Sequence, residues 1–144
     1  MISQKARYAL RALLFIAARD DGPPVQLSQM VEENNISQKY LQLVLLDLKR
    51  NGLVSSQRGR SGGYRLKRPA REISFANILR VTDGPIALSS CISDTGYRKC
   101  TDCFDEKVCA IRAALLETRK KTASVLESYD LESAAQALRS AGAL

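Results

Sequence analysis

The stretch from Ile36 to Leu66, "ISQKYLQLVLLDLKRNGLVSSQRGRSGGYRL", predicts a helix that is followed by a β-hairpin. Ser37 is a favourable N-cap residue, and Gly52 is a favourable residue just beyond a helix end. Between them, the apolar residues that recur every three or four positions are Leu41, Val44, Leu45 and Leu48. This spacing predicts an amphipathic helix that buries one face and exposes the other.

A shorter helix is predicted directly before it, with Leu27, Met30 and Val31 on its buried side and two asparagines at its end. Two short helices joined by a tight turn, with polar residues at the start of the second, form a helix-turn-helix. Such a start meets base edges in DNA, where glutamine can pair with adenine and lysine can donate to guanine. The residues predicted to lie there are Gln38, Lys39, Tyr40 and Gln42. Solvated positions on an amphipathic helix would show the same pattern.

The hairpin is predicted from two short strand candidates, Val54 to Gln57 and Tyr64 to Leu66. Glycines between them supply the backbone freedom that a hairpin tip requires. The segment Arg58 to Arg71 carries six basic residues and no acid, so we expect its counterion to be DNA. The residues of this wing that are predicted to contact DNA are Arg58, Arg60, Ser61, Gly62, Gly63, Tyr64 and Arg65. A solvated basic loop is the alternative.

Another helix is predicted at the start of the chain, where Ser3 is the candidate N-cap and "DDGPP" ends the helix. Its apolar positions are Ala6, Ala9, Leu10, Leu13, Leu14 and Ala17. Lys5 and Arg7 in its first turns complete the predicted DNA contacts. After the hairpin, "SFANILRVTDG" predicts a further short helix that buries Phe75, Ile78, Leu79 and Val81.

The charge distribution separates the two halves of the chain. The 144 residues are 45% hydrophobic, which is enough for one domain with a core, and the net charge is +7. Residues 1–70 hold 12 Lys or Arg and 5 Asp or Glu, whereas residues 71–144 hold 10 of each. A basic surface confined to one module is typical of a protein that binds a polyanion such as DNA.

No membrane-spanning segment is predicted. No run approaches the roughly 18 apolar residues that cross a bilayer. The N-terminal stretch carries Lys5, Arg7 and Arg11 within its apolar pattern, and no small-residue cleavage site follows it. We therefore expect a cytoplasmic protein without a membrane partner.

The segment "CISDTGYRKCTDCFDEKVC" holds all four cysteines of the chain, Cys91, Cys100, Cys103 and Cys109. Four cysteines this close together in a cytoplasmic protein predict a metal site and not disulfides. The chain has no histidine, which excludes mixed Cys/His zinc sites. Four thiolates suit an iron–sulfur cluster, 2Fe-2S or 4Fe-4S, as well as a structural zinc ion. A thiol switch without metal is the third alternative.

No enzyme active site is predicted. The absence of histidine removes histidine-based acid–base and nucleophilic catalysis. The glycines of "RGRSGGY" precede a strand and not a helix N-terminus, so they do not match a phosphate-binding loop. The cysteines alone would also fit a small iron–sulfur electron-transfer protein, but such a protein would not need a basic wing.

A long helix is predicted after the cysteines. The apolar or small residues that step by three and four along it are Val108, Ile111, Leu115, Thr118, Thr122, Val125 and Tyr129. This heptad seam could pack back onto its own domain, but the polar stretch "ETRKKTAS" favours an extended helix that pairs with a second copy across a two-fold axis. The last stretch, "DLESAAQALRSAGAL", predicts a short amphipathic helix with a frayed end. The expected division is a winged helix-turn-helix domain at 1–85, a cysteine-rich loop at 86–107, and a dimerisation helix with a tail at 108–144.

These features resemble the family of bacterial winged-helix regulators that includes IscR, NsrR and RirA. The resemblance covers nearly all of residues 1–135 and is most specific in "ARYALRALLFIA", in Ile36 to Leu66, in "ISFANILRVTDG" and in the cysteine loop. It implies a mainly α, winged helix-turn-helix homodimer that crosses through the long helix and carries a cluster in the loop. Cys91 and the pair Cys103 and Cys109 match the spacing of three family cysteines, and Cys100 is additional.

The chain departs from the family at three positions. Arg112 stands where IscR has a histidine after its last cysteine, and Tyr8 stands where some nitric-oxide sensors have an acidic residue. We therefore assign all four cysteines as ligands, with Glu106 or a ligand from the partner subunit in reserve. Gln42 replaces a glutamate of IscR, so the operator sequence does not carry over.

Together these observations predict a sequence-specific DNA-binding transcriptional regulator, a repressor. Its iron–sulfur cluster would set its affinity for an inverted-repeat operator on double-stranded DNA. The candidate signals are iron, cluster supply, nitric oxide and redox state. The alternatives are a DNA-binding regulator that uses zinc or a thiol switch, and the electron-transfer protein.

Overall fold

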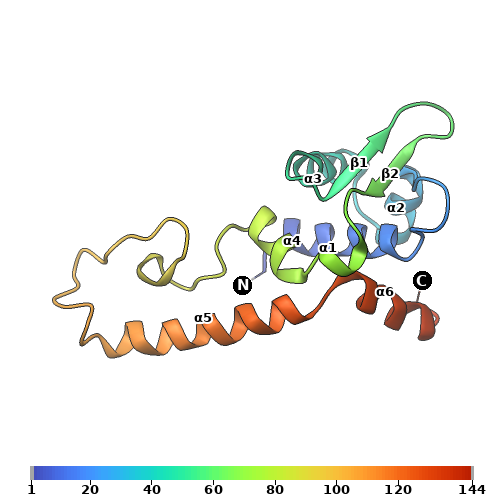
Figure 1. Cartoon of the computed structure of the whole chain (residues 1–144). Helices are drawn as coiled ribbons and strands as arrows, with labels where there is room; N and C mark the ends of the chain where they lie inside the picture. Colours follow the sequence, from blue (N-terminus) through green and yellow to red (C-terminus); the bar gives the residue numbers. More distant parts are fainter. Residues whose placement is uncertain (1, 144) are drawn as a thin grey trace.

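The computed structural model describes residues 2–143, and Figure 1 shows how its elements are arranged. In chain order they are α1 (Gln4–Ala17), α2 (Leu27–Asn34), α3 (Gln38–Arg50), β1 (Val54–Gln57), β2 (Gly63–Leu66), the 3-10 turn η1 (Ala70–Glu72), α4 (Phe75–Thr82), the 3-10 turn η2 (Ser90–Ile92), α5 (Ala110–Ser128) and α6 (Leu131–Ser140). A mainly helical fold with a two-stranded wing and a long helix near its end confirms the predicted fold class. Within residues 2–143, no helix combines the length and the apolar content that crossing a membrane requires.

Helix α1 lies at the centre of the core. The Ser3 hydroxyl accepts a hydrogen bond from the Ala6 amide at 3.0 Å, as an N-cap residue should. The Ser3 amide also donates to the Asp83 carboxylate at 2.9 Å, which ties the start of α1 to the end of α4. The residues that α1 buries are Ala6, Ala9, Ala12, Leu13, Phe15, Ile16 and Ala17. Its many alanines leave room for α3, α4 and α6 to pack closely around it.

The turn between α2 and α3 is made by two local devices. Asn35 ends α2 in the left-handed region with φ of 49°, a conformation that asparagine tolerates better than most residues. The Ser37 hydroxyl then begins α3 by accepting from the Tyr40 amide at 3.3 Å. The buried residues of α3 are the four predicted ones, Leu41, Val44, Leu45 and Leu48. The opposite side of α3 is therefore free to meet a ligand.

The wing consists of β1, β2 and the loop that joins them. The strands pair antiparallel, with Val54 opposite Leu66 and Gln57 opposite Gly63. Tyr64 also exchanges two backbone hydrogen bonds with Val25, at 2.8 and 2.9 Å. The segment before α2 thus fixes the angle at which the wing leaves the body, and Figure 1 shows the wing projecting beside α3 and α2.

Helix α6 packs against α1, although the two helices lie near opposite ends of the sequence. Leu131 is fully buried in the main core, and Ala135 is buried beside it. The Leu131 amide donates to the Ile73 carbonyl at 3.0 Å, and the Phe75 amide donates to the Tyr129 carbonyl at 2.9 Å. The sequence grouped α6 with the dimerisation helix, whereas its side chains complete the core of the N-terminal helices.

Helix α5 behaves differently, because none of its residues is buried. It extends away from the helical core in Figure 1, and the segment that holds the cysteines runs out from α4 to the N-terminal end of α5, which lies farthest from the core. The predicted seam is open to solvent, with Val108 76% and Ile111 73% exposed. At its C-terminal end, α5 contacts α4 through the ion pair of Glu127 with Arg80, at 2.5 Å.

Candidate functional site

The exposed start of α3 presents three of the residues that the sequence predicted to read bases. Gln38, Lys39 and Gln42 are exposed, with Gln38 and Gln42 one helical turn apart. Tyr40 is half-buried, and its ring lies edge-on to that of Tyr8 with centroids 5.6 Å apart. Tyr40 therefore supports the junction of α1 and α3, while Gln38, Lys39 and Gln42 face solvent.

The tip of the wing exposes Arg58, Arg60 and Ser61. The Gly62 amide donates to the Gly59 carbonyl at 3.0 Å and closes the tip, where Gly59 has a φ of 103°. Gln26, which the sequence analysis did not single out, donates through Nε2 to the Arg60 carbonyl at 3.5 Å. Gln26 also caps α2 through a reciprocal pair with Gln29. The spacing of three residues between the two glutamines is that of a capping box, and it was the sequence signal that could have identified Gln26.

Gly62 and Gly63 shape the wing through their lack of a side chain. A Cβ at Gly62 would lie 2.3 Å from the Gln57 carbonyl oxygen, and one at Gly63 would lie 2.5 Å from the Val25 carbonyl oxygen. Gly63 also has a φ of 150°, which L side chains rarely adopt. These two glycines allow the close backbone approach that sets the wing against the body.

The remaining predicted DNA contacts differ in their surroundings. Tyr64 is half-buried against the core, and the Arg65 guanidinium donates to the Asp20 carbonyl at 3.4 Å. Arg7 is exposed on α1, whereas the Lys5 ammonium pairs with the Asp47 carboxylate at 2.6 Å. Exposed cations thus gather on the wing tip and α3, while Lys5 and Arg65 already have partners within the chain.

All four cysteines line one cavity of about 400 Å³, which we call the cysteine cavity. Cys91 is buried on η2, and Cys109 is the N-cap of α5, its Sγ accepting from the Arg112 amide at 3.4 Å. Cys100 and Cys103 lie on the connecting loop and are partly buried. Folding therefore brings together residues that the sequence spreads over the whole segment between η2 and α5.

Arg112 links the two ends of the cysteine cavity. Its Nε donates to the Cys91 carbonyl at 3.3 Å and lies 3.9 Å from Oε1 of Glu106. The Tyr97 hydroxyl donates to the same Glu106 oxygen at 2.6 Å, and this hydrogen bond raises the pKa of Tyr97. The sequence analysis placed Glu106 in reserve as a ligand, and both of these contacts are made to Oε1 of its carboxylate.

Two thiols of the cysteine cavity, those of Cys100 and Cys103, have a raised pKa. The pKa of Cys100 is raised, first by its hydrogen bond with Cys91 and then by burial, and burial raises the pKa of Cys103. Within residues 2–143, no three Cys, Asp or Glu side chains already stand in an arrangement that would hold a metal ion. The residues present nevertheless fit a thiolate-bound cluster, because four cysteine side chains line one cavity and a guanidinium lies beside them.

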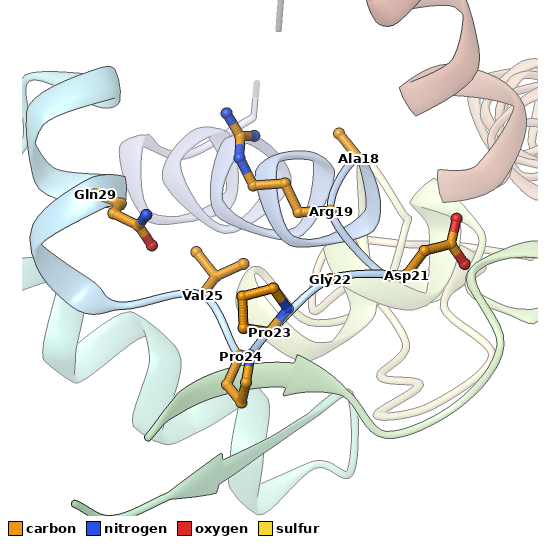
Figure 2. A pocket seen from close by; sticks show the side chains of 8 residues that line it. All are labelled: Ala18, Arg19, Asp21, Gly22, Pro23, Pro24, Val25 and Gln29. Carbon is orange, nitrogen blue, oxygen red and sulfur yellow. The ribbon is translucent and has the colours of Figure 1, made fainter. Parts of the chain in front are cut away.

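A second cavity of about 400 Å³ lies between the end of α1 and the start of α2 (Figure 2). Two of its polar lining side chains, Arg19 and Gln29, are engaged within the chain. The Arg19 guanidinium lies 3.5 Å from the centre of the Phe15 ring and donates to the Phe15 carbonyl, and Gln29 accepts from the Gln26 amide at 2.9 Å. Prolines 23 and 24 form much of the remaining wall. We assign no ligand to this cavity.

The paired helices α2 and α3, the wing with its basic tip and the exposed polar start of α3 define a winged helix-turn-helix DNA-binding protein. The chain matches the Rrf2 family, described as an iron-dependent transcriptional regulator, over residues 2–137. It therefore belongs to the Rrf2 family of DNA-binding transcriptional regulators, which is not a family of enzymes.

Individual relatives agree with this assignment. The chain is 40% identical over 135 residues to an rrf2-like HTH-type transcriptional regulator of Rhodobacter capsulatus, covering 92% of this chain and 90% of the relative. It is 33% identical over 131 residues to the HTH-type transcriptional regulator IscR of Xenorhabdus nematophila, covering 91% and 76%. The structure of CymR, the global cysteine regulator of B. subtilis, superposes with a TM-score of 0.79 at 31% identity, covering 94% and 96%.

Proposed function

We propose that this regulator is a homodimeric repressor whose affinity for an inverted-repeat operator is set by an iron–sulfur cluster on Cys91, Cys100, Cys103 and Cys109. The observation that carries the proposal is that all four thiols line one cavity at the start of α5. The cluster, when bound, supplies a group that responds to iron, oxygen or nitric oxide. Thiolate-only ligation agrees with the lack of histidine in the chain.

Two of the proposed ligands would connect such a site to α5. Cys91 belongs to η2 and Cys109 caps α5, so ligation of both would hold the loop against the first turn of that helix. Arg112 already bridges these two positions through the Cys91 carbonyl. Loss of the shared ligand would leave the connecting residues with few internal contacts, so the segment would loosen.

The C-terminal end of α5 would pass this change to the DNA-binding surface. Glu127 pairs with Arg80 of α4, and the Tyr129 ring lies 6.0 Å from that of Phe75. The end of α4 is tied in turn to the start of α1 through Asp83 and Ser3. A difference in DNA-binding free energy of about 1.4 kcal/mol between the two states would change the affinity tenfold, which lies within ordinary allosteric coupling.

Dimerisation would complete the DNA-binding surface. The exposed seam of α5 offers apolar residues that have no partner within the described part of the chain. Pairing two copies through this seam would place two α3 helices and two wings on one duplex. Such an arrangement requires half-sites that are inverted and separated by one or more helical turns.

Anaerobic purification followed by iron and sulfide analysis tests the cluster directly. We expect a brown protein that contains both elements, and a DNA affinity that differs between the loaded and the cluster-free forms. A colourless protein that contains zinc would support a structural zinc site instead. A protein with neither metal, whose DNA affinity responds to thiol oxidation, would support the thiol switch.

Alanine substitution of each cysteine tests the ligand set. We expect the four single variants to lose or destabilise the chromophore, because each would leave iron with an open coordination position. Thr101→Ala is the matched control, since Thr101 is exposed in the same loop and is not a proposed ligand. A Cys100→Ala variant that keeps a stable cluster and full regulation would remove Cys100 from the ligand set.

A further inference from the structure

The outward face of α3 carries two large apolar side chains. Leu43 is 56% exposed and Leu46 is 41% exposed, although the exposed side of an amphipathic helix is ordinarily polar. They follow the three polar residues at the start of the helix, and together with Lys39 they lie on the side of α3 opposite the buried leucines. A pair of exposed leucines on this face needs a physical reason.

Their spacing places both leucines in line with the residues proposed to read bases. Leu43 follows Lys39 by four residues, and Leu46 follows Gln42 by four residues, so each pair shares one face. With a rise of about 1.5 Å per residue, Leu43 lies about 6 Å beyond Lys39 along the helix axis. Because base pairs are about 3.4 Å apart along the duplex axis, a helix that lies in the major groove places these two side chains at most about two base pairs apart.

The surroundings of the two leucines suit a polyanion. Lys5, Arg50 and Leu43 line the same groove, whose single acid is Asp47. The Asp47 carboxylate is paired with Lys5 at 2.6 Å and lies 3.9 Å from the Arg50 guanidinium. Because Lys5 and Arg50 together outweigh the single charge of Asp47, the groove carries a net positive charge beside Leu43 and Leu46. Duplex DNA matches both properties, because its phosphates are anionic and its major groove exposes the apolar methyl group of thymine.

We propose that Leu43 is a specificity-determining residue that contacts the C5-methyl group of thymine in the major groove, with Leu46 next to it. Of the four bases, thymine alone presents a methyl group there. This inference rests on the proposed binding of DNA through α3, and it adds a base identity to that function. Leu43 selects a thymine within about two base pairs of the base that Lys39 contacts.

Removing the methyl group without changing base pairing tests the proposal. A duplex is first selected from a random library with the wild-type protein, and Lys39→Ala then locates the base read by Lys39. Each thymine of the selected duplex is next replaced by uracil, one at a time in both half-sites. Binding is measured for the wild-type protein, Leu43→Ala and Leu43→Met, and the thermal midpoint of each variant is recorded.

We expect one uracil position, within about two base pairs of the Lys39 contact, to weaken wild-type binding about fourfold per half-site, the value of burying one methyl-sized group. Leu43→Ala should bind the thymine duplex more weakly and lose the distinction between thymine and uracil. Leu43→Met should keep much of it, because methionine still offers an apolar side chain. All three proteins should melt alike, since Leu43 is exposed.

Two outcomes overturn the inference while leaving DNA binding intact. One is a wild-type protein that binds every uracil duplex as tightly as its thymine parent. The other is a Leu43→Ala variant that keeps the thymine preference but becomes monomeric in light scattering, which would assign this face to a protein contact. A wild-type protein that enriches no sequence would contradict the proposed DNA-binding function and the inference with it.

Discussion

Helices α1 and α5 differ in what they can bury within one chain. Helix α1 has 14 residues and buries seven of them, whereas α5 has 19 residues and buries none. Most helical stability in proteins comes from packing an apolar face and not from intrinsic propensity. The DNA-binding core therefore holds itself together, while α5 in the proposed dimer would depend on a second copy and on the proposed site at its N-terminal end. The part of the protein proposed to sense is the part with the fewest internal contacts.

The largest effect should come from Leu131, which follows α5 in sequence but belongs to the core with α1. Leu131→Ala should lower the free energy of unfolding by about 2–5 kcal/mol, because it leaves a cavity in a fully packed site. Urea unfolding followed by circular dichroism measures this loss. Leu88→Ala is the control, since Leu88 is largely exposed and its truncation should cost less than about 0.5 kcal/mol. Equal stability of the two variants would show that Leu131, and with it α6, does not contribute to the stability of the core.

The next effect concerns the exposed seam of α5. Val125→Asp should convert a dimer into a monomer at micromolar concentration, because it places a carboxylate in an apolar contact between two copies. Light scattering after gel filtration reports the mass. Ser124→Asp adds the same charge one position off the seam and should remain dimeric. A monomeric wild-type protein would instead make the seam a surface for another partner.

A smaller effect is expected at the wing. Arg60→Ala should weaken binding to all DNA sequences and reduce the slope of log affinity against log salt by roughly one, as each lost phosphate contact does. Fluorescence anisotropy over a series of salt concentrations gives the slope. Lys121→Ala removes the same charge from α5, where Lys121 pairs with Glu117, and should leave the slope unchanged. An unaltered slope for Arg60→Ala would show that Arg60 does not contact a phosphate group.

The smallest effect should come from the contact between Asp94 and Arg119, which ties the cysteine loop to α5. The hydrogen bond from Arg119 lowers the pKa of Asp94, so the contact is present above the ordinary aspartate range. It should be lost only as pH falls through the lowered pKa. At neutral pH, Asp94→Asn should modestly speed proteolysis within residues 86–107. Glu132→Gln on α6 removes one charge elsewhere, and an equal rate in both variants would leave this tie without effect.

Much of the fold could be predicted because its signals are local. Ser3 and Ser37 both cap the helices they precede, and the four apolar residues predicted to face inward on α3 are all buried. The second strand begins at Gly63, one residue before its predicted start, because Gly63 pairs with Gln57. On α4, Ile78 and Leu79 are buried as predicted, whereas Phe75 and Val81 are only half-buried.

The sequence by itself determined the helix-turn-helix, the basic wing and the crowding of four cysteines, since these depend on neighbouring residues, charge and spacing. Only the tertiary structure decided where distant segments meet. It packs α6 on α1, sets Gly63 against Val25, and gathers Cys91 and Cys109 in one cavity with Arg112 between them. It also decided that Leu43 faces outward from α3 and that α5 buries nothing. The physical reason is that periodicity predicts which side of a helix is apolar, whereas the partner of that side is chosen by the packing of the whole chain.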